Sequence, residues 1–88
     1  MADIKNKYLI DFDILDSKGK RLGLIVEEVE MNGFFGYIVI ATKNSEPYGP
    51  GQRYKFFKNK ELRDKMLSIR IKNSRKRFLK KFKKLKAN

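Results

Sequence analysis

The side chains with the clearest chemical potential are the lysines and arginines in the second half of the chain. Residues 51–88 hold 16 basic and two acidic side chains, a balance of +14, and no acid follows Asp64. The first 50 residues hold six basic and eight acidic side chains, a balance of −2. A field of one sign attracts polyanions and speeds encounter with them. The charge therefore predicts a nucleic acid, an anionic membrane or an acidic protein face as the partner.

We expect a basic helix at 73–88, extended by the region of a strand at 53–57, to contact the phosphates of a nucleic acid. Each Lys or Arg can replace counterions condensed on the phosphates, and a helix of about 13 residues spans about 20 Å. The strand interleaves basic and aromatic residues, as in surfaces on which single-stranded bases stack. A plain strand with Tyr54 and Phe56 in the core is the preferred alternative. The predicted nucleic-acid-binding residues are Arg53, Lys55, Lys58, Lys72, Arg75, Lys76, Arg77, Lys80, Lys81, Lys83 and Lys84.

Apolar residues at helical spacing run through the same basic segment and leave a second function open. They form one stripe of Phe78, Leu79, Phe82 and Leu85. If the stripe packs on its own chain, the phosphate-binding hypothesis gains. If it is exposed, the helix docks on a partner protein, as in a protein-interaction module or a phage- or plasmid-type inhibitor. A membrane partner is disfavoured, because the helix is short and the sequence has no Trp and no lipidation signal.

Catalytic and metal chemistry find little support in the composition. His and Cys are both absent, which removes disulfides, the usual zinc sites and a histidine general base. Asp11 and Asp13 share one face of a predicted strand, and so do Glu28 and Glu30. Such pairs could hold Mg²⁺ or move a proton, but surface strands carry them routinely. We predict no enzyme, no catalytic residue, no metal site and no cofactor.

The elements that must position the basic residues are mainly strands. Apolar and polar residues alternate in the first half, and Asn-Gly at 32–33 is a strong hairpin signal. The apolar phase slips near Glu27 and Glu28, which suggests a β-bulge there. The predicted elements are strands at 7–15, 22–31, 35–42 and 53–57, a turn at 16–20 and a loop at 44–51.

The apolar residues of segment 58–72 fit both helical spacing and strand alternation. In a continuous helix, Leu62, Met66 and Ile69 would point one way, and Leu67 and Ile71 would point the opposite way together with the later stripe. We therefore predict a helical turn at 59–65, a strand at 66–72 and a new helix capped by Ser74. This gives a barrel-like β domain at 1–72 and a basic amphipathic helical tail at 73–88.

One stretch resembles a known family. The sequence DSKGKRLGLIVEEV at 16–29 is similar to the start of a PRC-barrel domain, where a glycine-containing turn leads into a long second strand. The resemblance covers residues 8–42. It implies a small five- or six-stranded SH3-like barrel that serves as an RNA-processing accessory or a docking module and is not usually an enzyme.

Together these observations predict a mainly β protein with a C-terminal helix (α+β). The sheet is either a small SH3-like or PRC-like barrel or a three-stranded antiparallel meander under the helix. The predicted function is non-catalytic, largely sequence-independent nucleic-acid binding, with RNA ahead of DNA. The start of the chain does not resemble a signal peptide, and no apolar run approaches the roughly 18 residues of a membrane span. We therefore expect a cytoplasmic protein, with its oligomeric state open.

Overall fold

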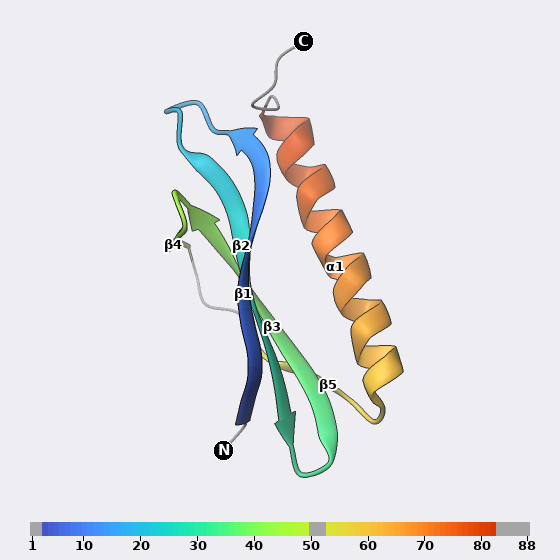
Figure 1. Ribbon diagram of the computed structural model, residues 1–88. Helices are drawn as coiled ribbons and strands as arrows, with labels where there is room; N and C mark the ends of the chain where they lie inside the picture. The colour runs from blue at the N-terminus through green and yellow to red at the C-terminus, as the bar shows by residue number, and fades with distance from the viewer. Residues whose placement is uncertain (1–2, 50–52, 83–88) are drawn as a thin grey trace.

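An antiparallel sheet lies along one side of a single long helix in the computed structural model, which describes residues 3–49 and 53–82 (Figure 1). The chain order is β1 (Asp3–Leu15), β2 (Arg21–Met31), β3 (Phe34–Lys43), β4 (Glu46–Pro47), β5 (Lys55–Phe57) and α1 (Lys60–Lys81). The first four strands lie side by side in sequence order, and β5 also pairs with β3. The three long strands form a meander, which is one of the two architectures that the sequence predicts.

Local turn chemistry sets the two long hairpins. Between β1 and β2, the carboxylate of Asp16 accepts hydrogen bonds from the backbone N–H groups of Lys18 and Lys20, each at 2.9 Å. Between β2 and β3, Asn32 and Gly33 have φ angles of 52° and 81°. Positive φ at both central residues is typical of a type I′ turn, whose twist matches that of the strands. Both predicted turns are confirmed.

The main core lies between the sheet and α1. Residues that pair across β2 and β3 project from the same face, and their register is uninterrupted from Leu22 to Met31. On the face toward the helix, Leu24 and Val26 are at most 2% exposed and cluster with Leu67 of α1. Partly buried apolar residues of the helix and its C-cap pack against this cluster. These are Ile71, Phe78, Leu79 and Phe82.

The irregularities of the sheet lie in β1, so the predicted bulge in the second strand is wrong. The β1–β2 register shifts between Ile4 and Asn6 and again between Asp11 and Ile14, whereas β2 pairs with β3 without a break. The change of apolar phase in β2 has another cause, since Val29 is fully buried on the face away from the helix. Its partner there is Gly36, and the ring of Phe56 lies over that glycine.

The predicted strand at 66–72 is wrong, because α1 is continuous over 22 residues. Its N-cap is Asn59, whose side chain accepts a hydrogen bond from the N–H of Leu62 at 2.7 Å. Ser74, the predicted cap, is buried in the middle of the helix. The prediction of a strand failed because it assumed that both apolar stripes of the segment are buried against other parts of the protein. In the structure, Leu62 and Ile69 on the outer stripe are each 43% exposed.

The predicted barrel is also wrong, because the sheet is open. The segment expected to supply a further strand is helical, so β1 remains an edge and the other side ends in the short β4 and β5. The predicted boundary between residues 72 and 73 falls inside α1. Among the residues that the structure describes, no helix is both long enough and apolar enough to cross a membrane.

Candidate nucleic-acid interface

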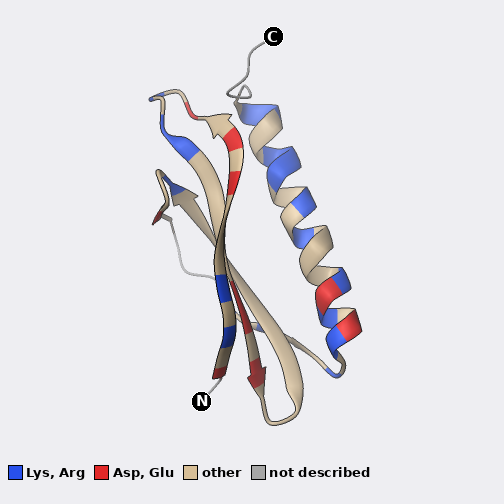
Figure 2. Ribbon diagram, viewed as in Figure 1, with Lys and Arg blue, Asp and Glu red and all other residues tan. Residues whose placement is uncertain are grey.

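The C-terminal half of α1 forms a basic surface (Figure 2). From residue 70 to residue 81 the helix carries seven basic side chains and no acidic one. Across residues 3–49 and 53–82, none of the seven lies within 4.0 Å of a carboxylate. At about 1.5 Å per residue, the segment spans about 18 Å. We call it the basic half of α1; its cations are Arg70, Lys72, Arg75, Lys76, Arg77, Lys80 and Lys81.

Three further residues predicted to contact nucleic acid lie away from most of this surface. Arg53, Lys55 and Lys58 are exposed, but they lie in and around β5, just before the helix begins. About 20 helical residues, or about 30 Å of rise, separate this end from Lys81. Two groups of cations therefore lie near opposite ends of α1. Lys83 and Lys84 lie outside the described residues.

The interleaved aromatic residues next to these cations are partly engaged within the protein. The hydroxyl of Tyr54 donates a hydrogen bond to Glu27 at 3.2 Å, and its ring lies 6.0 Å from that of Phe56. Phe56 is half-buried, and Tyr54 is 39% exposed. The neighbouring Phe57 stacks on Tyr37 at 6.0 Å between centroids. Of these aromatic rings, Tyr54 leaves the largest area open to a base.

Most of the predicted docking stripe lies against its own sheet. Phe78, Leu79 and Phe82 are half-buried and pack on the main core. The ring of Phe78 lies 5.8 Å from that of Phe12, between centroids. Leu85, the last member of the stripe, lies outside the described residues. The described part of the stripe therefore attaches the basic helix to the sheet.

Three of the four carboxylates in the two predicted pairs have cationic partners: Asp11, Asp13 and Glu28. Arg21 contacts Asp11 at 2.8 Å and Asp13 at 3.0 Å. The N–H of Asp13 donates to Asp11 and, together with Arg21, holds the pKa of Asp11 below its ordinary value. Glu28 accepts a hydrogen bond from Tyr8 at 3.1 Å and faces the buried Arg63. No group of three or more potential metal ligands gathers in residues 3–49 and 53–82.

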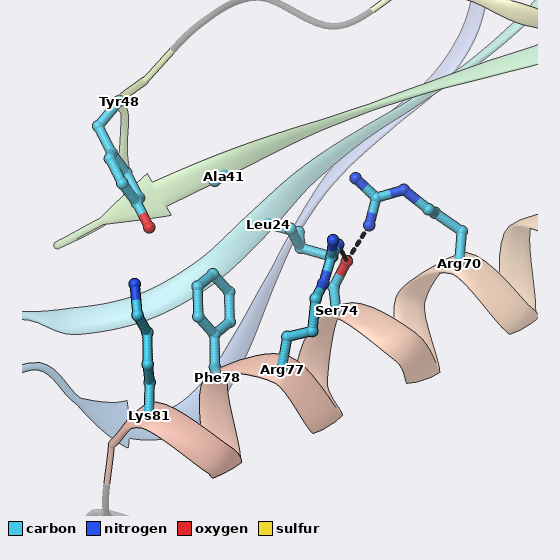
Figure 3. A pocket seen from close by; sticks show the side chains of 8 residues that line it. All are labelled: Leu24, Ala41, Tyr48, Arg70, Ser74, Arg77, Phe78 and Lys81. Carbon is cyan, nitrogen blue, oxygen red and sulfur yellow. Dashed lines mark hydrogen bonds between the residues drawn. The ribbon is translucent and has the colours of Figure 1, made fainter.

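Between α1 and the end of β3 lies a cleft of about 480 Å³ that the sequence analysis missed (Figure 3). Arg70, Arg77 and Lys81 extend from the helix toward the strands, and Tyr48 forms the opposite wall. Both guanidinium groups donate to the Oγ of Ser74, Arg77 at 3.4 Å. The remaining lining residues are Leu24, Ala41 and Phe78.

A sequence signal for this cleft does exist. Arg70, Ser74 and Arg77 follow one another at spacings of four and three, which places them on a single helical face. Leu67 and Phe78, which pack on the sheet, belong to the same face. Polar and basic residues on a core-facing stripe need a buried partner or a ligand. Dividing the segment into a strand and a helix at Ser74 concealed this pattern.

The cleft carries uncompensated positive charge. Burial lowers the pKa of Arg70, and the neighbouring charge of Arg77 lowers it further. Asp16 lies near this end of the molecule but is occupied: Lys43 contacts it at 3.3 Å, and its side chain is only 3% exposed. The Lys43 ammonium also lies 4.7 Å from the centre of the Tyr48 ring. The lining residues contain no carboxylate.

No family model, curated protein or solved structure matches the chain. The function is therefore inferred from the charges and contacts described above. The residues brought together are the cations of the basic half of α1, the cleft beside them and the apolar stripe that anchors them.

Proposed function

We propose that the protein binds nucleic acid through the phosphate backbone, without catalysis and largely without reading sequence, and that it binds RNA ahead of DNA. One observation carries the proposal: the basic half of α1 has seven cations and no carboxylate within 4.0 Å of any of them in the described part of the chain. Surface cations usually alternate with acids, which lowers their local field. A one-signed surface favours a polyanion, with counterion release as the driving force.

The helix is suited to backbone contact more than to base readout. Its inner side packs on the sheet through Phe78 and Leu79, so only the outer side can reach a nucleic acid, and its charged residues there are all Lys or Arg in the basic half. Its exposed cations are long and flexible, and Lys in particular acts as a point charge toward phosphate. Phosphate contacts fix position but carry no sequence information. We therefore expect weak discrimination among sequences.

The packing also bears on the alternative, a helix that docks on a partner protein through the stripe of Phe78, Leu79, Phe82 and Leu85. The three described members already contact the core of their own chain. Docking them in a groove would require the helix to leave the sheet and would expose the main core. This supports the phosphate-binding proposal over the alternative.

The test is the salt dependence of binding. RNA and DNA duplexes of matched sequence, together with their single strands, are titrated with the protein over a range of salt concentrations. With about four to seven phosphate contacts, the plot of log affinity against log salt has a slope of roughly −3 to −6 on a duplex. The slope is expected to stay the same when the duplex sequence is changed. A slope near zero, or a strong preference for one sequence, contradicts the proposal.

A further inference from the structure

We propose that the cleft between α1 and the end of β3 is a built phosphate-binding site, in which Arg70 and Arg77 hold one phosphate group of a bound nucleic-acid strand. The choice of nucleic acid as the source of the phosphate rests on the function proposed above. The site for the anion rests on the geometry of the cleft. The two parts are therefore tested separately.

The first argument is the convergence of two like charges. Arg70 and Arg77 both reach the hydroxyl of Ser74, a residue that is only 3% exposed. Guanidinium groups remain charged in proteins, so this arrangement brings the positive charge of the half-buried Arg70 close to that of the exposed Arg77. No carboxylate lies within 4.0 Å of either arginine in the described residues, and the residues outside that part include no Asp or Glu. A bound anion would supply the missing counter-charge.

The second argument is the supply of donors. A hydroxyl oxygen accepts two hydrogen bonds, and the two arginines provide them to Ser74. Each guanidinium has five N–H donors, so several remain for an anion. Lys81 extends into the same cleft beside them (Figure 3). Planar guanidinium groups match the oxygens of a phosphate in pairs, which makes Arg the usual residue for such recognition.

The third argument is the size and lining of the cleft. Its volume of about 480 Å³ lies within the range of roughly 300–1,000 Å³ that is usual for ligand sites. That is more room than one phosphate group needs, so an attached sugar can enter with it. The wall opposite the arginines is the ring of Tyr48, and Phe78 closes one side. A charged end and an aromatic wall suit a nucleotide unit better than a free inorganic ion.

The test follows individual side chains by NMR in the full chain. Inorganic phosphate is added at constant ionic strength, while the Nε–H signals of Arg70 and Arg77 and the amide of Ser74 are recorded. We expect saturable shifts confined to the cleft. The Arg77→Gln variant should bind phosphate at least about fivefold more weakly. Arg75→Gln is the matched control, because Arg75 and Arg77 are both exposed and carry the same charge, but only Arg77 lines the cleft.

A second arm uses a single-stranded oligonucleotide of about 12 nucleotides. We expect it to shift the same cleft signals and inorganic phosphate to compete with it there. Thermal melting of each variant establishes that it is folded. If Arg75→Gln weakens phosphate binding as much as Arg77→Gln, or if no cleft signal saturates, the phosphate site is overturned even if the oligonucleotide binds. If phosphate binds in the cleft but the oligonucleotide does not bind at all, nucleic acid is the wrong source and the proposed function fails.

Discussion

Individual charged residues fall into two classes in this protein. Several carboxylates of the sheet half have a specific cationic partner, as in the pairs Asp11–Arg21 and Asp16–Lys43. The cations of the basic half of α1 have none in the described residues. Exposed ion pairs such as Asp11–Arg21 contribute little to stability, about 0–1 kcal/mol each. Their main consequence here is electrostatic, because paired acids cannot offset the field of the helix.

Tyr8 provides a residue-scale prediction about pH. Burial, reinforced by its hydrogen bond to Glu28, raises the pKa of Tyr8 from 10.0 to about 12. The folded protein therefore retains a proton that the unfolded chain releases above pH 10. Stability from this group is complete below pH 10 and is lost as the pH rises toward 12. Urea unfolding across this window should show wild type losing stability more steeply than Tyr8→Phe, which has no phenol to ionise.

The wild-type protein and the Tyr8→Phe variant share all their other titrating groups. Burial also raises the pKa values of Tyr37 and Tyr54, but these residues are unchanged in the variant, so the difference isolates Tyr8. Equal loss of stability in the two proteins between pH 10 and pH 12 would mean that the environment of Tyr8 in the fold does not hold its proton.

At the scale of elements, short-range chemistry made the hairpins predictable. The turn at 16–20 and the Asn32–Gly33 turn depend on residues next to one another in sequence, and both occur as expected. Strand faces were harder to predict. The phase change in β2 arises because Phe56 covers the face away from the helix near Val29. That contact joins residues far apart in sequence, and strand alternation carries no record of it.

The helix was mispredicted for a different physical reason. Its two apolar stripes suggested two elements, because an exposed apolar stripe was not considered. Soluble proteins do expose apolar side chains, and one stripe suffices to hold a helix on a sheet. The cap signal was also ambiguous, since Asn59 and Ser74 are both favoured N-cap residues. The hydrogen bond from the N–H of Leu62 to Asn59 marks the start, and the packing of Leu67 and Phe78 on the sheet shows that one helix continues through both segments.

The element-scale prediction compares the two stripes of α1. Phe78→Ala removes a half-buried ring that contacts Phe12, so it should cost about 2–3 kcal/mol, below the roughly 3–5 kcal/mol of a fully buried Phe. Ile69→Ala alters the outer stripe, where the side chain is 43% exposed, and should change stability by less than about 0.5 kcal/mol. Chemical denaturation measures both. The reverse order would mean that α1 faces the sheet with its other side.

On the scale of the whole molecule, the charge of the helix changes along the long dimension of the protein. The described part is elongated, with extents of 45 × 21 × 18 Å, and α1 lies along it (Figure 1). Glu61 and Asp64 lie in the first turns of the helix, whereas all the charged residues of its second half are basic (Figure 2). Basic residues near a helix C-terminus also complement its dipole. The sequence was sufficient to predict this charge gradient, because charge is additive along the chain.

The sequence carries a signal for the helical wall of the cleft, but not for the position of the opposite wall. The two walls come from α1 and from the segment after β4, where Tyr48 lies. Bringing them together depends on α1 continuing unbroken through Ser74, where a new helix was predicted to begin, and on the short hairpin at Asn44–Ser45, whose φ angles are 49° and 68°. The sequence predicts only a plain loop for that segment. The cleft, which depends on long-range packing, was therefore not predicted, whereas most of the basic half of α1, which depends on local composition, was.

The separation of cations along the molecule gives the last prediction. The double variant Lys80→Gln/Lys81→Gln removes two charges from the basic half of α1, and Lys55→Gln/Lys58→Gln removes two from the opposite end. All four side chains are exposed, and at positions 80 and 81, in α1, Gln keeps the helix propensity of Lys. If phosphates follow the basic half of α1, the first variant should lower affinity about tenfold and reduce the salt slope on duplexes by about 2, as expected for two lost contacts. The second variant should lower affinity by less than about threefold.

Equal losses of affinity in the two variants would mean that one long nucleic-acid strand spans both ends of the protein. A larger loss in the second variant would move the binding surface to β5 and its flanking residues, away from the helix.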